Sequence, residues 1–336
     1  SFSKQMEPVF CFESQNISCV KTVYPLPIRV ILYMVLGVMV IVTVCGNLLV
    51  TVSIIYFKQL HTPTNYLLVS LAVSDFLLGF LVMLPNMIQS VETCWYFGDI
   101  LCKVYMSSDV MLCTASIINL SLISIDRYNA VIHPLLYRRK MSGHVVLLMI
   151  SFSWSVSGVV GFGQIFLRLN ILGIEDFYNN FVACEGRCVL LQSGPSSTVS
   201  SVLSFYIPGI IMISLYLKIF FVAKRQLLSI QNTTCMTSAR DSDKKQAKAT
   251  KTLVVIMGAF LLCWAPFFLC NIIDPFISYS TPAALFETFV WLGYINSTLN
   301  PLIYAFFYTW FRKSFCLFAS GKVFKEDMSN ISLFTD

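Results

Sequence analysis

Seven apolar runs, each long enough to cross a lipid bilayer as a helix, constrain this chain more than any other feature of its sequence. A spanning helix needs about 20 mostly apolar residues, and only helices and closed barrels satisfy their backbone hydrogen bonds inside hydrocarbon. The composition agrees, with 57% hydrophobic and only 12% charged residues, against about 25% charged in soluble domains. We therefore predict an all-α membrane protein, a seven-transmembrane helix bundle. The runs are Val30–Tyr56, Asn65–Gln89, Lys103–Ile125, Val145–Leu167, Val199–Leu217, Thr252–Ile273 and Ala284–Tyr308.

The seven runs are expected to form one domain, residues 28–309, because seven helices pack around a single bundle. Residues 1–27 lack an apolar signal segment, so we predict an N-terminal extension followed by a first span that acts as the insertion signal. Residues 310–336 are predicted to hold a short amphipathic juxtamembrane helix, Trp310–Phe318, and a tail. The pattern predicts one flexible polar loop, Gln226–Gln246.

The distribution of basic residues predicts the orientation in the membrane. Of 23 Lys and Arg residues, 17 lie after the first, third and fifth runs or in the C-terminal tail, and six lie on the other side. Because basic residues concentrate on the cytoplasmic side, we expect an extracellular N-terminus and a cytoplasmic C-terminus in a multi-pass plasma membrane protein. The net charge of +6 reflects this bias and does not indicate a nucleic-acid partner.

Cysteines divide by compartment under this topology. Those in the spans are expected to be reduced and buried, whereas those outside meet an oxidising environment, and spacing alone leaves their pairing open. Cys316 in the juxtamembrane helix is either palmitoylated or an unmodified apolar contact. Among the N-x-S/T matches, only Asn16 lies in the outer compartment, so it is the expected glycosylation acceptor. The outer cysteines are Cys11, Cys19, Cys94, Cys102, Cys184 and Cys188.

Two acidic residues, Asp75 and Asp109, lie well inside the predicted membrane spans. Intramembrane carboxylates are costly and indicate function by default. Asp109 follows Cys102 by two helical turns, which places both near the outer third of the span. No basic residue in the spans is positioned to pair with Asp109, so a ligand cation is the predicted partner. The alternative is a protonated or water-solvated structural Asp.

Other residues are predicted to complete a pocket around Asp109. Serines near the outer end of the fifth span offer hydroxyl groups, although a helical serine often bonds only to its own backbone. Aromatic residues at helical spacing are usually core, but beside a carboxylate they can also form a cage for an ammonium group. We expect the Tyr294 hydroxyl to bond Asp109. The predicted ligand-binding residues are Asp109, Val110, Cys113, Thr114, Ser200, Ser201, Ser204, Trp264, Phe267, Phe268, Trp291 and Tyr294.

Asp75 lies deeper in the membrane and is expected to have neutral oxygen ligands around it. Such a set suits a small hard cation such as sodium, and a water-filled polar network without a fixed ion is the competing interpretation. No other cofactor is predicted. The candidate sodium ligands are Asp75, Ser116, Asn296 and Asn300, with Asn47 and Ser297 as further neighbours.

The last span combines a kink with polar residues, which indicates a moving part more than an anchor. Pro301 removes a backbone donor, and the polar residues of Asn296–Phe311 must face a protein interior. At the cytoplasmic end of the third span, Arg127 follows a long helix directly; a snorkelling arginine would be ordinary there. The predicted activation residues are Asp126, Arg127, Tyr128, Tyr216, Asn300, Pro301 and Tyr304.

Taken in order, short motifs in all seven spans resemble the rhodopsin-like (class A) G-protein-coupled receptors. The resemblance implies a receptor that responds to an outside ligand and activates a heterotrimeric G protein, and it places Asp109 where aminergic receptors hold the ligand amine. The motifs are Gly46-Asn47, Leu71–Asp75, Asp126-Arg127-Tyr128, Trp154, Pro208 with Tyr216, Cys263–Pro266 and Asn300–Tyr304.

Five further segments carry a narrower resemblance: Asn296–Phe311, Phe57–Asn65, Cys94–Asp99, Asn16–Cys19 and Cys184–Cys188. They resemble the trace amine-associated receptors within that class. The resemblance implies two disulfides, Cys102–Cys188 and Cys19–Cys184. It also implies a chemosensory receptor for protonated amines, with olfactory amine sensing and coupling to a stimulatory G protein as expectations.

The chain departs from that pattern in ways that affect ligand and basal activity. Some diamine-sensing members carry an acid on the fifth span. This chain has Ser200 and Ser201 there, and these neutral residues favour a monoamine as ligand. A second ammonium group could still bind to Glu92, Asp274 or Glu287 near the outer rim. Gln246 stands where an acid often pairs with the span-three arginine, which predicts a weaker resting lock. Ala265 in the span-six motif is expected to loosen that region.

Other functional classes fit less well. The sequence shows no nucleophile–base pair or nucleotide loop, so we do not expect an enzyme. A transporter would need a continuous polar path, which the fourth run lacks, and an opsin would need a lysine in the last span, which is absent between Pro282 and Phe311. The closest alternative is an aminergic neurotransmitter receptor of the catecholamine or serotonin type, because the serines of the fifth span suit a catechol.

Overall fold

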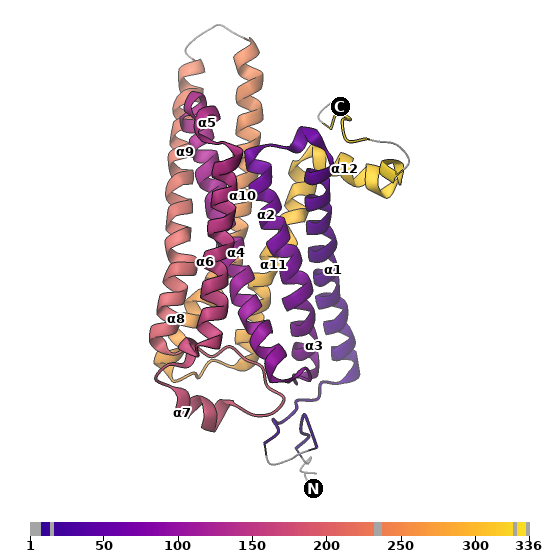
Figure 1. Cartoon of the computed structure of the whole chain (residues 1–336), viewed down its shortest axis with the longest axis vertical. Helices are drawn as coiled ribbons and strands as arrows, with labels where there is room; N and C mark the ends of the chain where they lie inside the picture. Colours follow the sequence, from indigo (N-terminus) through magenta and orange to yellow (C-terminus); the bar gives the residue numbers. More distant parts are fainter. Residues whose placement is uncertain (1–7, 14–16, 232–236, 325–327, 334–336) are drawn as a thin grey trace.

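The structure, a computed structural model, describes residues 8–13, 17–231, 237–324 and 328–333. Long helices run side by side in a bundle, with the N-terminus at one end and the C-terminal helix at the other (Figure 1). The predicted seven-helix fold is confirmed. The membrane-spanning segments are α1 (Leu26–Tyr56), α2 (Pro63–Leu77) with α3 (Leu84–Glu92), α4 (Gly98–Ile132), α6 (Gly143–Phe166), α8 (Gly194–Ser201) with α9 (Ile207–Gln231), α10 (Thr237–Ile273) and α11 (Ala283–Phe307).

Six helical segments among the described residues are long and apolar enough to cross a membrane by composition alone. The segment that falls short is α11, because its 25 residues include Asn296, Ser297, Thr298 and Asn300. These four side chains are buried, so the polar atoms of α11 face the bundle and not lipid, as its membrane setting requires.

The end of α9 and the start of α10 contradict one expectation from the sequence. Gln226–Gln246 was predicted to be a flexible loop, but residues 226–231 and 237–246 are helical, and the two helices extend together beyond the rest of the bundle (Figure 1). Residues 232–236 lie outside the described part of the chain. The segment contains no proline or glycine, so residues 226–231 and 237–246 hold no strong helix breaker.

Proline and irregular helical turns occur together in two spans. The π-helical turn η2 (Leu78–Met83) directly precedes α3 and its Pro85, and η5 (Val202–Tyr206) directly precedes α9 and its Pro208. Because proline cannot donate a backbone hydrogen bond, a π-helical turn just before it is a common way to absorb the missing bond.

Disulfides tie the N-terminal extension to the outer loops. Cys19–Cys184 joins it to the loop between α6 and α8, and Cys102–Cys188 joins that loop to α4, as the resemblance implied. A third bond, Cys11–Cys94, joins the extension to the turn between α3 and α4, a pairing that spacing had left open. Asn16, the expected glycosylation acceptor, lies outside the described residues.

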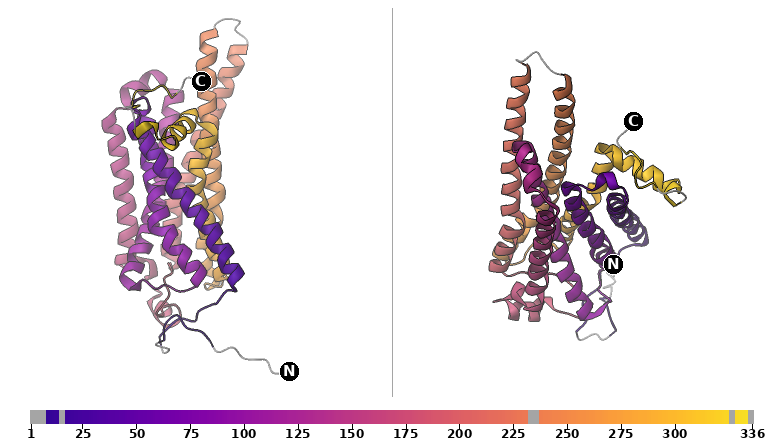
Figure 2. Two further views of the ribbon diagram at one scale, coloured as in Figure 1. Left: turned by 90° about the vertical axis from the view of Figure 1, so that its right-hand side faces the viewer. Right: turned by 45° about the horizontal axis from the view of Figure 1, so that its top comes forward.

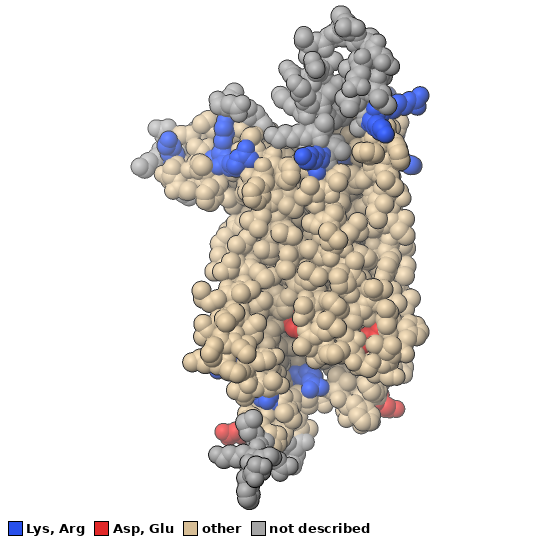
Figure 3. Space-filling model, turned by 180° about the vertical axis from the view of Figure 1, so that it is seen from behind, with Lys and Arg blue, Asp and Glu red and all other residues tan. Residues whose placement is uncertain are grey.

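The opposite end of the bundle carries two shorter helices, α5 (Pro134–Lys140) and α12 (Thr309–Ala319), whereas α7 (Glu175–Phe177) lies in the loop between α6 and α8. The amphipathic helix predicted at Trp310–Phe318 is α12; it projects sideways from this end of the bundle (Figure 1 and Figure 2) and buries Trp310 and Phe311. Lys and Arg side chains gather at this end, whereas the broad middle of the visible face is uncharged (Figure 3). This arrangement is that of a protein whose central band lies in lipid.

Candidate functional site

The carboxylate of Asp109 is half-buried on α4 and accepts two hydrogen bonds. The Tyr294 hydroxyl donates to its Oδ2 at 2.9 Å, as the sequence predicted, and the Cys113 thiol donates to its Oδ1 at 3.3 Å. Ion pairs between described residues involve Glu92 and Asp126 but not Asp109. The carboxylate therefore has two neutral donors and, within the described chain, no cation.

Aromatic rings surround this carboxylate from α10 and α11. Trp264 packs against Phe267, Phe268 and Tyr294 with ring centroids 5.7, 5.6 and 6.4 Å apart. Trp264 is held on its other side by Gly293, where an added Cβ would lie only 2.5 Å from the indole ring. These rings supply the apolar and cation-attracting surface that an ammonium group prefers.

A cavity of about 70 Å³ lies between Asp109 and these rings. Most of the predicted ligand-binding residues line it, including Val110, Cys113 and Thr114 on the turn below Asp109. Two predicted residues do not line it. Ser201 instead accepts a hydrogen bond from Asn271 at 3.1 Å, and the indole nitrogen of Trp291 donates to Ser90 and Glu287. The lining residues are Asp109, Val110, Cys113, Thr114, Ile117, Gln164, Leu190, Gln192, Ser200, Ser204, Trp264, Phe267, Phe268, Asn271, Val290 and Tyr294.

The wall opposite Asp109 is a network of amides that sequence reasoning missed. Gln164 on α6 and Gln192 in the outer loop both donate to the Ser200 hydroxyl, at 3.1 and 3.2 Å. Asn271 on α10 donates to Gln192 at 2.8 Å. The sequence contains one indication of this network: Gln164 and Asn271 are polar residues within the apolar fourth and sixth spans. The wall therefore offers a polar group of the ligand several partners and holds Ser200 in place.

Asp75 lies deeper in the bundle, where it is fully buried and well supplied with donors. Ser116 and Ser297 each donate to its Oδ1 at 2.8 Å, and Asn300 donates to its Oδ2 at 2.7 Å. Asn47 and Asn296 do not bond to it: the Asn47 amide donates to backbone carbonyls at Thr43 and Ser297. Asp75 thus joins α2, α4 and α11 at one point.

Several amide oxygens near this cluster lack a donor. The Oδ1 atoms of Asn47, Asn296 and Asn300 are buried without a hydrogen-bond partner among the described residues. Oxygen atoms of this kind suit a hard cation or ordered water. Within the described chain no group of three or more His, Cys, Asp or Glu side chains could hold a metal ion, so a cation would rely on one carboxylate and neutral oxygens.

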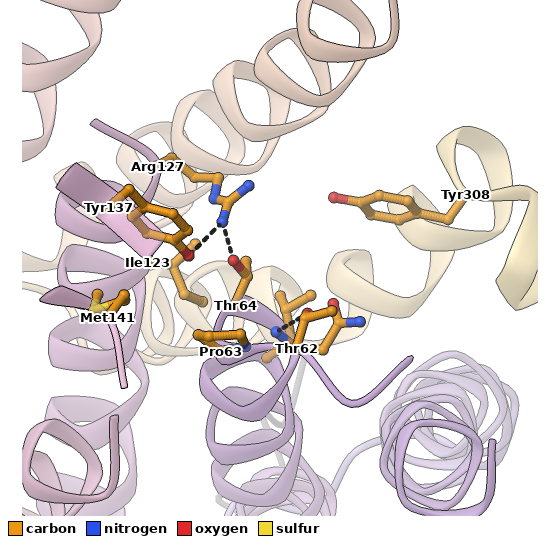
Figure 4. A pocket seen from close by; sticks show the side chains of 10 residues that line it. Thr62, Pro63, Thr64, Ile123, Arg127, Tyr137, Met141 and Tyr308 are labelled. Carbon is orange, nitrogen blue, oxygen red and sulfur yellow. Dashed lines mark hydrogen bonds between the residues drawn. The ribbon is translucent and has the colours of Figure 1, made fainter. Parts of the chain in front are cut away.

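At the far end of α4, Asp126 and Arg127 form a compact polar network with α2 and α5. The buried Asp126 carboxylate accepts hydrogen bonds from Arg127 at 2.6 Å, Thr64 at 2.7 Å and Tyr137 at 2.8 Å. Arg127 also bonds to the Thr64 and Tyr137 hydroxyls (Figure 4). Burial raises the pKa of the Tyr137 phenol, so the phenol remains a donor at neutral pH.

This network borders a cavity of about 570 Å³ that opens at the α12 end of the bundle. Tyr308, at the start of α12, faces it from the side opposite Arg127 (Figure 4). Of the other predicted activation residues, Tyr216 and Tyr304 have hydroxyls without a hydrogen-bond partner among the described residues. Tyr128 lies outside the network, with the Lys218 ammonium 6.0 Å from its ring centroid. The side chain of Gln246 lies outside the described residues.

Comparisons with known proteins cover the whole bundle. Residues 46–304 match the family described as 7 transmembrane receptor (rhodopsin family). The chain is 47% identical to trace amine-associated receptor 1 of Homo sapiens, over 97% of this chain and 98% of that protein. It is 43% identical to trace amine-associated receptor 4 of Mus musculus, over 97% and 96% of the two chains, and 43% identical to trace amine-associated receptor 2 of Mus musculus, over 100% and 98%.

Proposed function

Because the chain belongs to the rhodopsin family of seven-transmembrane receptors and, within it, to the trace amine-associated receptors, we propose that it binds a protonated amine at Asp109 and activates a stimulatory G protein. As a member of this family the chain is a multi-pass plasma membrane receptor and not an enzyme. We place the N-terminus outside the cell, since the basic residues gather at the α12 end (Figure 3).

The observation that carries this proposal is the uncompensated charge of Asp109. An ionised carboxylate removed from water is costly unless it is paired. The described residues offer Asp109 two neutral donors and no cation, and aromatic rings lie beside it. A ligand ammonium completes the pair and gains cation–π attraction from Trp264 and Tyr294.

Activation then follows from differential binding. A ligand shifts a receptor between conformations only by as much as it binds one of them better. The amine contacts α4 through Asp109 and α10 through Trp264, and Pro266 and Pro301 lie within α10 and α11 as points where these helices bend. Movement of the inner ends of α9 and α10 would widen the cavity beside Arg127 to admit a G protein.

A sodium ion beside Asp75 is a further part of this proposal. The residues that would hold it are Asp75, Ser116, Asn296 and Asn300, and the unpartnered Asn296 and Asn300 oxygens support it. The ion would supply positive charge to a carboxylate at the junction of three helices.

A second candidate function, a receptor for catecholamines or serotonin, is favoured by the hydroxyls of Ser200 and Ser204 in the cavity lining. These hydroxyls face the end of the cavity that a ring hydroxyl of such a ligand would reach. The two candidates share Asp109 and differ in what the polar wall binds.

The test is a cAMP reporter assay of cells that express the wild-type chain or Asp109→Asn, with a panel of amines and surface labelling. We expect a cAMP rise with at least one trace amine for the wild type, and loss of that response with unchanged surface expression for the variant. Normal potency in Asp109→Asn refutes the binding site, and a response confined to catecholamines or serotonin selects the second candidate.

A further inference from the structure

We propose that Glu287 is a second ammonium-binding carboxylate, so that the receptor accepts diamines with one charge on Asp109 and the other on Glu287. This inference rests on the proposed function, since it assumes that Asp109 binds the first ammonium. It assigns the second charge to α11 and not to the fifth span, where the chain has Ser200 and Ser201.

Three acidic side chains near the outer end are candidates for a second ammonium, and two of them are less suited than Glu287. Glu92 lies 2.5 Å from Arg29 and 3.6 Å from Lys21, so the chain neutralises it with its own cations. The Asp274 carboxylate lies in the turn that follows α10, accepts a backbone hydrogen bond from Thr281 at 3.2 Å, and is not on the helix that carries Tyr294.

Glu287 differs because its charge has no counter-ion. Its carboxylate accepts hydrogen bonds from the Ser90 hydroxyl at 2.6 Å and the Trp291 indole at 3.2 Å. The ion pairs between described residues do not include it. Both donors are neutral, so Glu287 resembles Asp109. Each is an acidic side chain in a largely apolar environment, and the described residues supply no positive charge to balance it.

An unpartnered amide oxygen close by supports a ligand role. Asn86, one turn before Ser90 on α3, is 2% exposed, and its Nδ2 is a further neutral donor near Glu287, not a partner for an ammonium. The Oε1 of Gln89 on the same helix is a buried acceptor that has no donor among the described residues. A buried amide oxygen and a carboxylate are acceptors for an ammonium group, and unmet buried polar atoms are otherwise costly.

Glu287 does not itself line the cavity beside Asp109, but Val290 and Tyr294 on the same helix do. Val290 lies one turn further along α11. Trp291, which donates to Glu287, packs edge-to-face on Tyr294 with centroids 5.5 Å apart, and Tyr294 donates to Asp109. Glu287 and Tyr294 are seven residues apart, which separates their Cα atoms by about 10 Å along the helix.

This geometry sets what the ligand must be. A monoamine neutralises only one of the two carboxylates, whereas a flexible diamine that spans them neutralises both. The apolar surface between them, formed by Val290 and the rings of Trp291 and Tyr294, suits a methylene chain. We therefore expect the potency of diamines to depend on chain length, with an optimum where the ammonium groups reach both acids.

The experiment compares α,ω-diaminoalkanes of increasing length with alkylamines of the same lengths, in cells that express the receptor and a cAMP reporter. For the wild type, the best diamine is expected to exceed its matched monoamine in potency. Glu287→Gln keeps the shape and the hydrogen bonds to Ser90 and Trp291 but removes the charge. It should weaken that diamine about 10- to 100-fold and change the matched monoamine by less than about threefold.

Two controls separate this effect from a general change of charge. Glu92→Gln removes the same charge from a carboxylate that the chain already neutralises, and Asp274→Asn removes one from the rim; both should leave the preference for diamines intact. An equal loss for diamines and monoamines in Glu287→Gln would mean that Glu287 only positions Trp291, and the inference fails. If Glu287→Gln does not reach the surface, a wild type without any preference for diamines at any length also overturns it.

Asp109→Asn distinguishes the two levels of the hypothesis. Loss of all amine responses in that variant, together with an unchanged diamine preference in Glu287→Gln, leaves the proposed function in place and removes only the second site. Retained amine responses in Asp109→Asn remove both.

Discussion

The contact between Gly293 and Trp264 gives the sharpest prediction about the floor of the ligand cavity. A Cβ at position 293 would lie 2.5 Å from Cζ3 and 2.6 Å from Cε3 of the Trp264 ring. Carbon atoms pack favourably at about 3.5–4.0 Å. The Gly293→Ala variant therefore requires the indole or the α11 backbone to move by about 1 Å.

The cost follows from what surrounds the indole. Trp264 is 5% exposed and lies against Phe267, Phe268 and Tyr294, so it has no open space to move into except the ligand cavity. Overpacking of this kind destabilises by about 1–3 kcal/mol. The gain in helix propensity from Gly to Ala, about 1 kcal/mol, offsets part of it.

The chain offers a matched control in Gly258. It lies on α10, the helix that carries Trp264, and an added Cβ there would meet nothing within 4 Å. Gly258→Ala gains the same helix propensity without the clash. Melting of the detergent-solubilised receptor, together with amine potency in the cAMP assay, reports both consequences.

We expect Gly258→Ala to melt at or above the wild-type temperature with unchanged potency. Gly293→Ala should melt below Gly258→Ala and lose about tenfold in amine potency, because a shift of about 1.4 kcal/mol is a factor of ten. If the two variants behave alike in both measurements, Trp264 is free to move and the reasoning about the cavity floor is wrong.

Three further predictions concern the hydrogen bonds of Asp126 and Arg127, the start of the sixth span, and a disulfide of the N-terminal extension. Thr64→Val removes a hydroxyl that bonds both Asp126 and Arg127. It should raise ligand-independent cAMP severalfold, since hydrogen bonds to charged groups contribute about 1.5–3 kcal/mol. An unchanged basal cAMP level would contradict a role of Thr64 in holding Arg127 in the resting receptor. Gln246→Glu restores an acid at the start of the sixth span and should lower basal cAMP, which the same reporter measures. Joint replacement of Cys11 and Cys94 by serine removes the disulfide between the N-terminal extension and the turn between α3 and α4. The melting temperature should fall, with a cost of up to about 2–4 kcal/mol, while Asp109-dependent responses persist. Equal melting temperatures of the variant and the wild type would show that the other two disulfides suffice.

The sequence predicts those features of the fold that depend on local composition. Apolar runs locate the spans, and the polar residues of the last run turn inward, because hydrocarbon excludes unpaired polar groups. The extension of α9 and α10 past the membrane was missed, since a polar segment without proline or glycine is compatible with either a loop or a solvated helix. The π-helical turns before Pro85 and Pro208 have no signature beyond the proline itself.

The ligand site likewise has features that the sequence predicts and features that only tertiary packing determines. The bond between Tyr294 and Asp109 was predicted, because a lone acid and a tyrosine on facing spans have few alternative partners. The wall formed by Gln164, Gln192 and Asn271 was not, because its members come from three separate segments and only tertiary packing brings them together. The engagement of Glu92 by Arg29 and Lys21 is likewise a property of the folded N-terminal extension, so the sequence could not distinguish Glu92 from Glu287.

The two intramembrane acids are expected to differ in what they contribute to stability. Both carry a charge that the described chain does not balance, so replacement by alanine removes a similar electrostatic cost from each. The donors left behind differ: Asp75→Ala strands two serine hydroxyls and the Asn300 amide, whereas Asp109→Ala strands one hydroxyl and a weakly donating thiol. Unmet buried donors cost about 1–3 kcal/mol, so Asp75→Ala should melt well below Asp109→Ala in the absence of ligand. Equal melting temperatures would show that Asp75 does not join α2, α4 and α11 as its hydrogen bonds indicate, and that the serines and Asn300 find other partners within the bundle.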